Sequence, residues 1–167
     1  HLALLAAAWL AASLGLHQLL TFYPTRPQAL VAAHKKFLLS RVADACLLVA
    51  LGLFLVGAGT LRIDALNALA LGAGALPPAV HGALVLLVLG VLLKSAQLPF
   101  HGWMTQVMEA PTPVSALLHA GIVNIGGFVL IRLAPLVDQA PLARGLLVTV
   151  GLTTALVASL VMTTRVS

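Results

Sequence analysis

Residues 83–103 read ALVLLVLGVLLKSAQLPFHGW. An apolar run precedes Lys94, and Pro99 follows five residues after it. A charged side chain at mid-membrane costs about 2.5–3.5 kcal/mol on insertion scales, so such residues are rare and tend to mark ion or proton paths. Proline lacks a backbone donor and breaks or kinks a helix. This stretch therefore predicts a membrane helix that is broken near Pro99 and carries one lysine.

The composition of the whole chain agrees with a membrane setting. Of the 167 residues, 61% are hydrophobic and 8% are charged, and the mean hydropathy is +1.11. Soluble domains carry about 25% charged residues. These values exclude a soluble enzyme, a disordered chain and a disulfide-stapled mini-protein. The net charge of +5 forms no stripe suited to nucleic acid, and the single Cys46 has no partner for a disulfide within the chain.

Long gaps between the charged residues indicate how many times the chain crosses the membrane. No Asp, Glu, Lys or Arg occurs in residues 1–25, 45–61, 65–93, 110–131 or 145–164. A helix rises about 1.5 Å per residue and needs about 20 apolar residues to span the hydrocarbon. The sequence predicts an all-α polytopic protein with one transmembrane domain over residues 1–167. Its expected spans are about 2–23, 36–56, 80–108 (broken), 113–133 and 142–164.

Three further expectations concern the segments outside these spans. Leucines among polar residues in 61–75 suggest a helix that lies at the membrane interface. The chain begins without Met and stops just after a hydrophobic run, which we interpret as a fragment of a longer polytopic protein. Basic residues cluster with Asp44 around the first loop, which the positive-inside rule places in the cytoplasm; they are Arg26, Lys35, Lys36 and Arg41.

Lys94 is the candidate proton carrier of the chain. Desolvation favours the neutral form of an amine, so a buried lysine can exchange protons. The alternative is that its long stem carries the ammonium to the membrane surface. Lys94, Gln97 and His101 follow a spacing of three and four, which predicts a shared polar face before the kink. His101 could equally lie at the interface beside a kink that serves packing.

Other polar residues in the spans have both a functional and a structural interpretation. His119 lies within the fourth span and could relay protons, since histidine titrates near neutral pH. It could also be a hydrogen-bonded structural histidine. Arg41 and Asp44 are three residues apart, which favours an ion pair within one helix. Asp44 might instead adjust the charge of a nearby lysine such as Lys36.

No motif for catalysis, metal or cofactor binding occurs in the sequence. There is no Walker loop, no GxGxxG and no nucleophile triad. His17, His34 and His81 fall on different predicted segments, and one cysteine cannot build a thiolate zinc site. We therefore expect no cofactor or metal, and no catalysis, in this chain. Gly126 and Gly127 are expected to permit close helix packing.

Two motifs resemble those of a known family. The stretch LKSAQLPFHGW (93–103), followed by APTPVSALLHA (110–120), is similar to the signature of the antiporter-like membrane subunits. These include subunit L of NADH-quinone oxidoreductase and the large subunit of Mrp antiporters. KKF at 35–37 and SRVAD at 40–44 extend the resemblance more weakly. It implies a fold with two inverted five-helix repeats, of which this chain would be the first.

The resemblance also implies roles for particular residues. Lys94 matches the central lysine of the broken helix, which the family uses to move protons, and His119 matches the histidine of the next helix on the hydrophilic axis. Arg41 and Asp44 match a charged pair at the start of the second helix. In respiratory subunits a glutamate follows the tryptophan of the first helix, whereas Leu10 follows Trp9 here.

Finer sequence features point to one branch of the family. MEAP at 108–111 and GIVNIGGF at 121–128 look like the DabB branch, and residues 104–106 depart from the respiratory Leu-Pro-Asp. This branch implies an ion-conducting, most simply proton-conducting, subunit of a complex that accumulates inorganic carbon in bacteria. The implied partner is a DabA-like zinc protein, and the implied location is the bacterial inner membrane.

Two other functional classes stay open at this stage. The chain could be a proton-translocating subunit L of NADH-quinone oxidoreductase or an Mrp-type antiporter subunit, with other subunits of those complexes as partners. It could also be a structural scaffold without conduction, in which Lys94 reaches the membrane surface.

Overall fold

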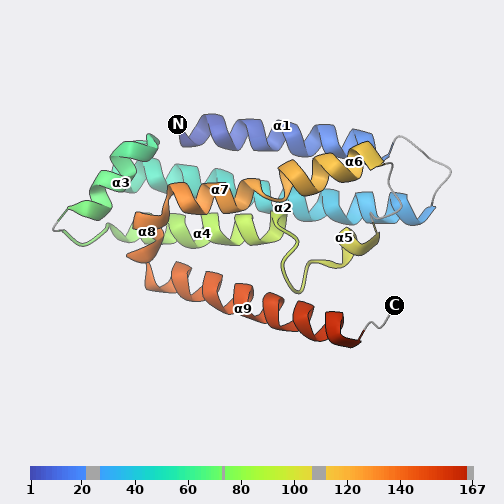
Figure 1. Ribbon diagram of the computed structural model, residues 1–167. Helices are drawn as coiled ribbons and strands as arrows, with labels where there is room; N and C mark the ends of the chain where they lie inside the picture. The colour runs from blue at the N-terminus through green and yellow to red at the C-terminus, as the bar shows by residue number, and fades with distance from the viewer. Residues whose placement is uncertain (22–26, 73, 107–111, 165–167) are drawn as a thin grey trace.

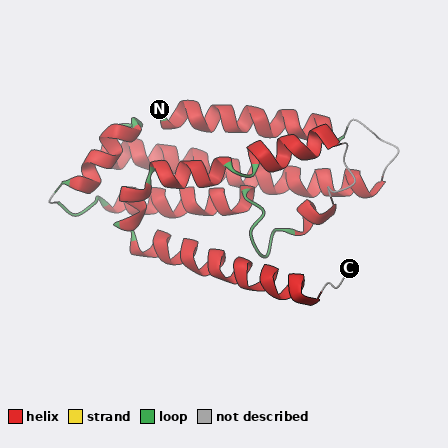
Figure 2. Cartoon of the chain, in the orientation of Figure 1, coloured by secondary structure: helices red, strands yellow, loops and turns green. Residues whose placement is uncertain are grey.

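The computed structural model describes residues 1–21, 27–72, 74–106 and 112–164. Across these ranges the chain is helical and contains no strand (Figure 2). The all-α prediction is therefore confirmed for this part of the chain. In chain order the helices are α1 Leu2–Leu20, α2 Pro27–Ala58, α3 Ile63–Leu71, α4 Pro78–Lys94, α5 Gly102–Gln106, α6 Thr112–Leu117, the π-helical turn η2 Leu118–Ile122, α7 Ile125–Arg132, α8 Ala134–Asp138 and α9 Pro141–Thr164.

Helix length separates the membrane-spanning candidates from the shorter elements. Within the described ranges, three helices are long and apolar enough to cross a membrane, namely α1, the Leu30–Ala58 part of α2, and α9. α4 is apolar but has 17 residues. The fourth expected span, 113–133, is divided among α6, η2 and α7 rather than forming one helix.

The long helices lie side by side and define two ends of a bundle (Figure 1). α2 packs against both α1 and α4, and α4 also contacts α7 and α9. α3 and α8 pack together at the end where α1 begins and α2 stops. α5 contacts α2 at the opposite end, where α1 stops and α2 begins. We call these the α3 end and the α5 end.

Glycines allow α4 to approach its neighbours closely near its last turns. A Cβ on Gly90 would lie 3.1 Å from Leu47 Cγ and 3.2 Å from the Ala43 carbonyl oxygen, so α2 and α4 are nearly in backbone contact there. A Cβ on Gly126 would overlap the Ser95 hydroxyl. Gly126 therefore has the packing role expected of it, whereas Gly127 has open space around it.

The helix break comes earlier than the proline predicted. α4 ends at Lys94, and Ala96 has a φ of +52°, a left-handed conformation that non-glycine residues rarely adopt. The expected shared face of Lys94, Gln97 and His101 is therefore wrong, because helical spacing no longer applies once the backbone has left the helix. His101 is exposed, on the far side of the break.

Candidate functional site

The last residue of α4 forms a buried ion pair with α2. Lys94 Nζ lies 2.5 Å from Asp44 Oδ1, and the two side chains are 3% and 7% exposed. Because Lys94 ends its helix in the middle of the bundle, its ammonium stays inside and does not reach the surface. Burying two charges is costly unless they are paired, and here the pairing is direct.

Arg41 holds the other oxygen of the same carboxylate. Arg41 Nη2 lies 2.7 Å from Asp44 Oδ2, one helical turn away on α2, and its side chain is 30% exposed. The predicted pair within one helix is confirmed. Both oxygens of Asp44 face Arg41 and Lys94, so Asp44 forms no ion pair with Lys36, but Arg41 and Asp44 both lie within electrostatic range of that lysine, as the alternative interpretation requires. Arg41 also lies over the Phe37 ring, with Cζ 5.1 Å from the ring centroid.

Trp9 of α1 completes the surroundings of the lysine. Its ring centroid lies 4.8 Å from Lys94 Nζ, and Trp9 is 1% exposed. A cation over an indole face is attracted by about 0.5–2 kcal/mol, more when water is excluded. Lys94 thus contacts one carboxylate and one aromatic ring, supplied by two different helices.

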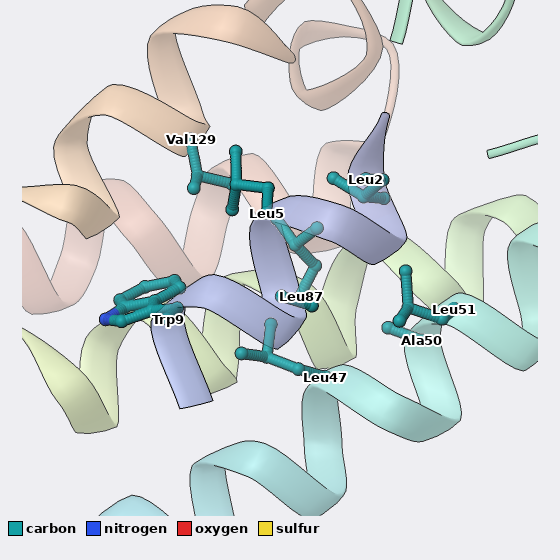
Figure 3. A pocket seen from close by; sticks show the side chains of 9 residues that line it. Leu2, Leu5, Trp9, Leu47, Ala50, Leu51, Leu87 and Val129 are labelled. Carbon is teal, nitrogen blue, oxygen red and sulfur yellow. The ribbon is translucent and has the colours of Figure 1, made fainter. Parts of the chain in front are cut away.

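Apolar side chains fill the space on the α3 side of this pair. Figure 3 shows side chains from α1, α2, α4 and α7 that converge on a cavity of about 10 Å³. That volume is close to the minimum needed for one water molecule. Its lining residues are Leu2, Leu5, Ala6, Trp9, Leu47, Ala50, Leu51, Leu87 and Val129. We call this set the apolar layer.

On the α5 side of the pair the buried groups are polar. Lys36 Nζ donates to the backbone oxygen and to the hydroxyl of Ser13, each at 3.0 Å. Lys36, Ser40 and Ser13 are 4%, 4% and 2% exposed. Among the residues that the structure describes, no carboxylate pairs with Lys36. A second buried lysine, Lys36, therefore lies within electrostatic range of the Lys94–Asp44 pair and is hydrogen-bonded to a serine.

Two histidines meet beyond Lys36. The rings of His17 and His34 are edge to face, with centroids 5.7 Å apart, and His17 also lies 4.5 Å from the Phe37 ring. As the sequence predicted, the two histidines belong to different segments, and they come together because α1 and α2 pack antiparallel (Figure 1). His81 lies at the start of α4, towards the other end.

The remaining predicted site residues lie apart from this cluster. His101 comes just before α5, and its neighbours Phe100 and Gly102 line an open groove of about 410 Å³ against Lys35 and Leu39 of α2. The backbone of His119 lies in η2. The side chain of His119 is outside the described part of the structure.

Helical spacing links the residues that sequence reasoning missed. Trp9, Ser13 and His17 are four residues apart on α1, so they share one face. On α2 the same spacing relates Lys36, Ser40 and Asp44, all of which are buried. A search for polar residues at steps of four on adjacent helices would have found Ser13 and His17, because such stripes face each other when the helices pack.

The chemistry available here is that of proton exchange and ion pairing. In the described ranges no group of three or more His, Cys, Asp or Glu side chains could hold a metal ion. The cluster offers amines, imidazoles, hydroxyls, a guanidinium and a single carboxylate. Ionisable residues buried among apolar membrane helices are typical of proteins that move ions or protons.

Comparison with known proteins defines the family. The profile of the family described as "NADH:quinone oxidoreductase/Mrp antiporter, TM" matches residues 1–167. The chain belongs to this family and is a multi-pass membrane protein. That assignment agrees with the resemblance seen in the sequence motifs.

Individual relatives refine the comparison. The chain is 49% identical to the "Probable inorganic carbon transporter subunit DabB" of Hydrogenovibrio crunogenus, over 100% of this chain and 32% of that protein. It is 47% identical to the "Probable inorganic carbon transporter subunit DabB2" of Halothiobacillus neapolitanus, over 99% and 30%. A more distant relative is "NADH-quinone oxidoreductase subunit L" of Mycobacterium tuberculosis, at 38% over 95% and 25%. The chain spans about a third of the length of the first two relatives.

Proposed function

We propose that this chain is the first inverted five-helix repeat of the ion-conducting membrane subunit of an energy-coupled complex that accumulates CO2 or bicarbonate. The observation that carries the proposal is the buried pair of Lys94 and Asp44 at the break of α4. The 47–49% identity to two proteins named as inorganic carbon transporter subunits supports inorganic carbon as the species that the complex accumulates. The family supports ion conduction.

The proton is the ion that the cluster suits best. A hard cation such as Na⁺ needs several free oxygen ligands. Both oxygens of Asp44 already face cations, and the neighbouring groups are nitrogen bases. Amines and imidazoles bind and release protons, so the same groups can pass H⁺ along.

Each site residue has a role in this proposal. Lys94 carries the proton, and Asp44 stabilises the charged form while Arg41 competes for the same carboxylate. Lys36 exchanges protons with Lys94 on the α5 side. His119 accepts the proton from Lys94 and passes it towards the rest of the subunit. His101 exchanges protons with water at the α4 break.

The setting of the complex follows from the branch that the sequence resembles. The subunit crosses the bacterial inner membrane, with the loop between α1 and α2 in the cytoplasm, as the basic residues there favour. Five crossings are proposed, with α4 and the α6–α7 segment as the broken ones. The chemistry of CO2 hydration belongs to a DabA-like zinc protein as partner, so this chain performs no catalysis.

The alternative is a proton-translocating subunit L of NADH-quinone oxidoreductase, or an Mrp-type subunit. It is favoured by the 38% identity to a subunit L over 95% of the chain. Leu10 opposes it, because a carboxylate is expected beside the tryptophan of α1 in respiratory subunits. Co-purification with the full-length subunit decides: one large zinc protein supports the first function, and flavin and iron–sulfur subunits support the second.

The test of conduction is Lys94→Gln in the full-length subunit with its partner. Proton flux into proteoliposomes and growth at ambient CO2 are measured, with Lys35→Gln as the control because Lys35 is an exposed lysine on α2. We expect Lys94→Gln to abolish both readouts in an assembled complex and Lys35→Gln to keep them. Unchanged flux in Lys94→Gln would indicate a scaffold and refute the proposal.

A further inference from the structure

The contact between His17 and His34 has no role in the site described so far. We infer that these two histidines form the port through which protons pass between water at the α5 end and the buried Lys36. The inference rests on the proposed function, since a port has meaning only if Lys94 exchanges protons.

Burial increases stepwise along this line of residues. His34 is exposed and His17 is half-buried, whereas Lys36 and Ser13 are buried. His17 follows Ser13 by one helical turn on α1, and His34 precedes Lys36 by two residues on α2. With ring centroids 5.7 Å apart, the two imidazoles are within reach of one bridging water. The line therefore leads from the exposed His34 ring to the interior, and Lys36 lies within electrostatic range of His17.

The hydrogen bond of the exposed ring leaves one nitrogen for exchange. His34 Nδ1 lies 2.7 Å from the Leu30 carbonyl oxygen, which can only accept, so Nδ1 donates its hydrogen. In the neutral ring Nε2 is then a free base. A hydronium ion gives its proton to Nε2 and leaves as water, and the imidazolium returns to neutral by giving a proton to His17.

The geometry at Lys36 suits a transient acceptor of this proton. A neutral amine has two hydrogens and one lone pair, and two hydrogen bonds to Ser13 use both hydrogens. The lone pair remains to take the proton from His17. Lys94 and Arg41 lie within electrostatic range of Lys36, as does Asp44, whose oxygens are already occupied. Arg41 opposes a lasting charge on Lys36. Once Lys94 has passed on its own proton, its neutral amine has a lone pair that can take the proton from Lys36.

The competing explanation is that His17, His34 and Phe37 merely pack against one another. A packing role would survive substitution by a residue of similar size, and it would not respond to an added base. A proton port would lose flux on such a substitution and recover when a soluble base replaces the missing imidazole.

The experiment measures proton flux into proteoliposomes that hold the full-length subunit with its partner. His17→Gln and His34→Gln are compared with His81→Gln, the matched control at the start of α4. We expect a drop of about 100-fold in the double variant, the size typical of losing one positioned proton carrier. His34→Ala should also lose flux, and imidazole buffer on the side of the α1–α2 loop should restore it, because the His34 side chain is exposed.

Lys94→Gln is assayed in parallel so that the two proposals fail separately. If Lys94→Gln abolishes flux while the double histidine variant keeps it, or if imidazole restores nothing, the port is overturned and the proposed function stands. If Lys94→Gln leaves proton flux intact, both the port and the proposed function are refuted.

Discussion

Asp44 of α2 supplies the carboxylate that pairs with Lys94 of α4, and its Oδ1 lies 2.5 Å from Lys94 Nζ. The residue after Trp9, where the resemblance to respiratory subunits implies a glutamate, is Leu10. The counter-charge of the lysine thus comes from the second helix, and the same carboxylate is shared with Arg41. The ion pair is therefore one of the contacts that joins α2 to α4.

Asp44→Asn should be among the most damaging single changes in this chain. It leaves the Lys94 ammonium buried without a carboxylate, which costs about 3–5 kcal/mol. We expect proton flux to disappear and the melting temperature of the purified complex to fall. Asp44→Glu restores the charge at a longer reach and should recover part of the flux. Full flux in Asp44→Asn would show that Lys94 does not depend on this carboxylate.

Leu10→Glu tests whether the family's usual carboxylate position can replace Asp44. Trp9 touches Lys94, and Leu10 is the half-buried residue that follows it on α1. In an Asp44→Asn background, Leu10→Glu should restore a measurable part of the proton flux, because it returns one negative charge to the site. Leu10→Gln, which has the same size without the charge, is the control. Equal flux from the Glu and Gln variants would contradict the electrostatic explanation.

Ser13→Ala should weaken the hold on Lys36 without removing it. The variant loses the hydroxyl acceptor but keeps the backbone oxygen of residue 13, which also lies 3.0 Å from Nζ. Loss of one hydrogen bond to a charged or amine group costs about 1–3 kcal/mol. The thermal midpoint of the complex should drop accordingly, while Ser159→Ala on the exposed face of α9 should leave it unchanged. No difference between the two variants would exclude a structural role for the Ser13 hydroxyl.

Gly90→Ala should separate α2 from α4 beside the ion pair. Its Cβ would lie 3.1–3.2 Å from Leu47 and the Ala43 carbonyl, and overpacking of this kind costs about 1–3 kcal/mol. We expect reduced thermal stability together with reduced flux. Gly15→Ala is the control, because nothing lies within 4 Å of its Cβ position, and it should be neutral or slightly stabilising. A destabilised Gly15→Ala would point to helix bending rather than packing as the cause.

The sequence was sufficient to predict the helical class, the membrane setting and the burial of Lys94. Each depends on local properties: apolar runs, the cost of a buried charge, and the helix-breaking effect of proline. The Arg41–Asp44 pair was predictable for the same reason, since both residues lie on one helical turn.

What the sequence did not reveal depends on the packing between helices. The partner of Lys94 is 50 residues away along the chain, and its position was set by the register in which α2 packs against α4 at Gly90. The contact of His17 with His34 likewise arises because α1 and α2 run antiparallel. The prediction that Lys94 and His101 share a helical face was wrong because the backbone leaves the helix at Ser95, before Pro99.

The apolar layer beyond Trp9 also determines where the membrane voltage acts. A potential falls mainly across the region that excludes water and mobile charge, and the apolar layer on the α3 side of Lys94 is such a region. Moving one charge through the whole field corresponds to about 2.3 kcal/mol per 100 mV. If the subunit conducts protons as proposed, transfers between the α5 end and Lys94 use little of this energy, because the apolar layer lies beyond them.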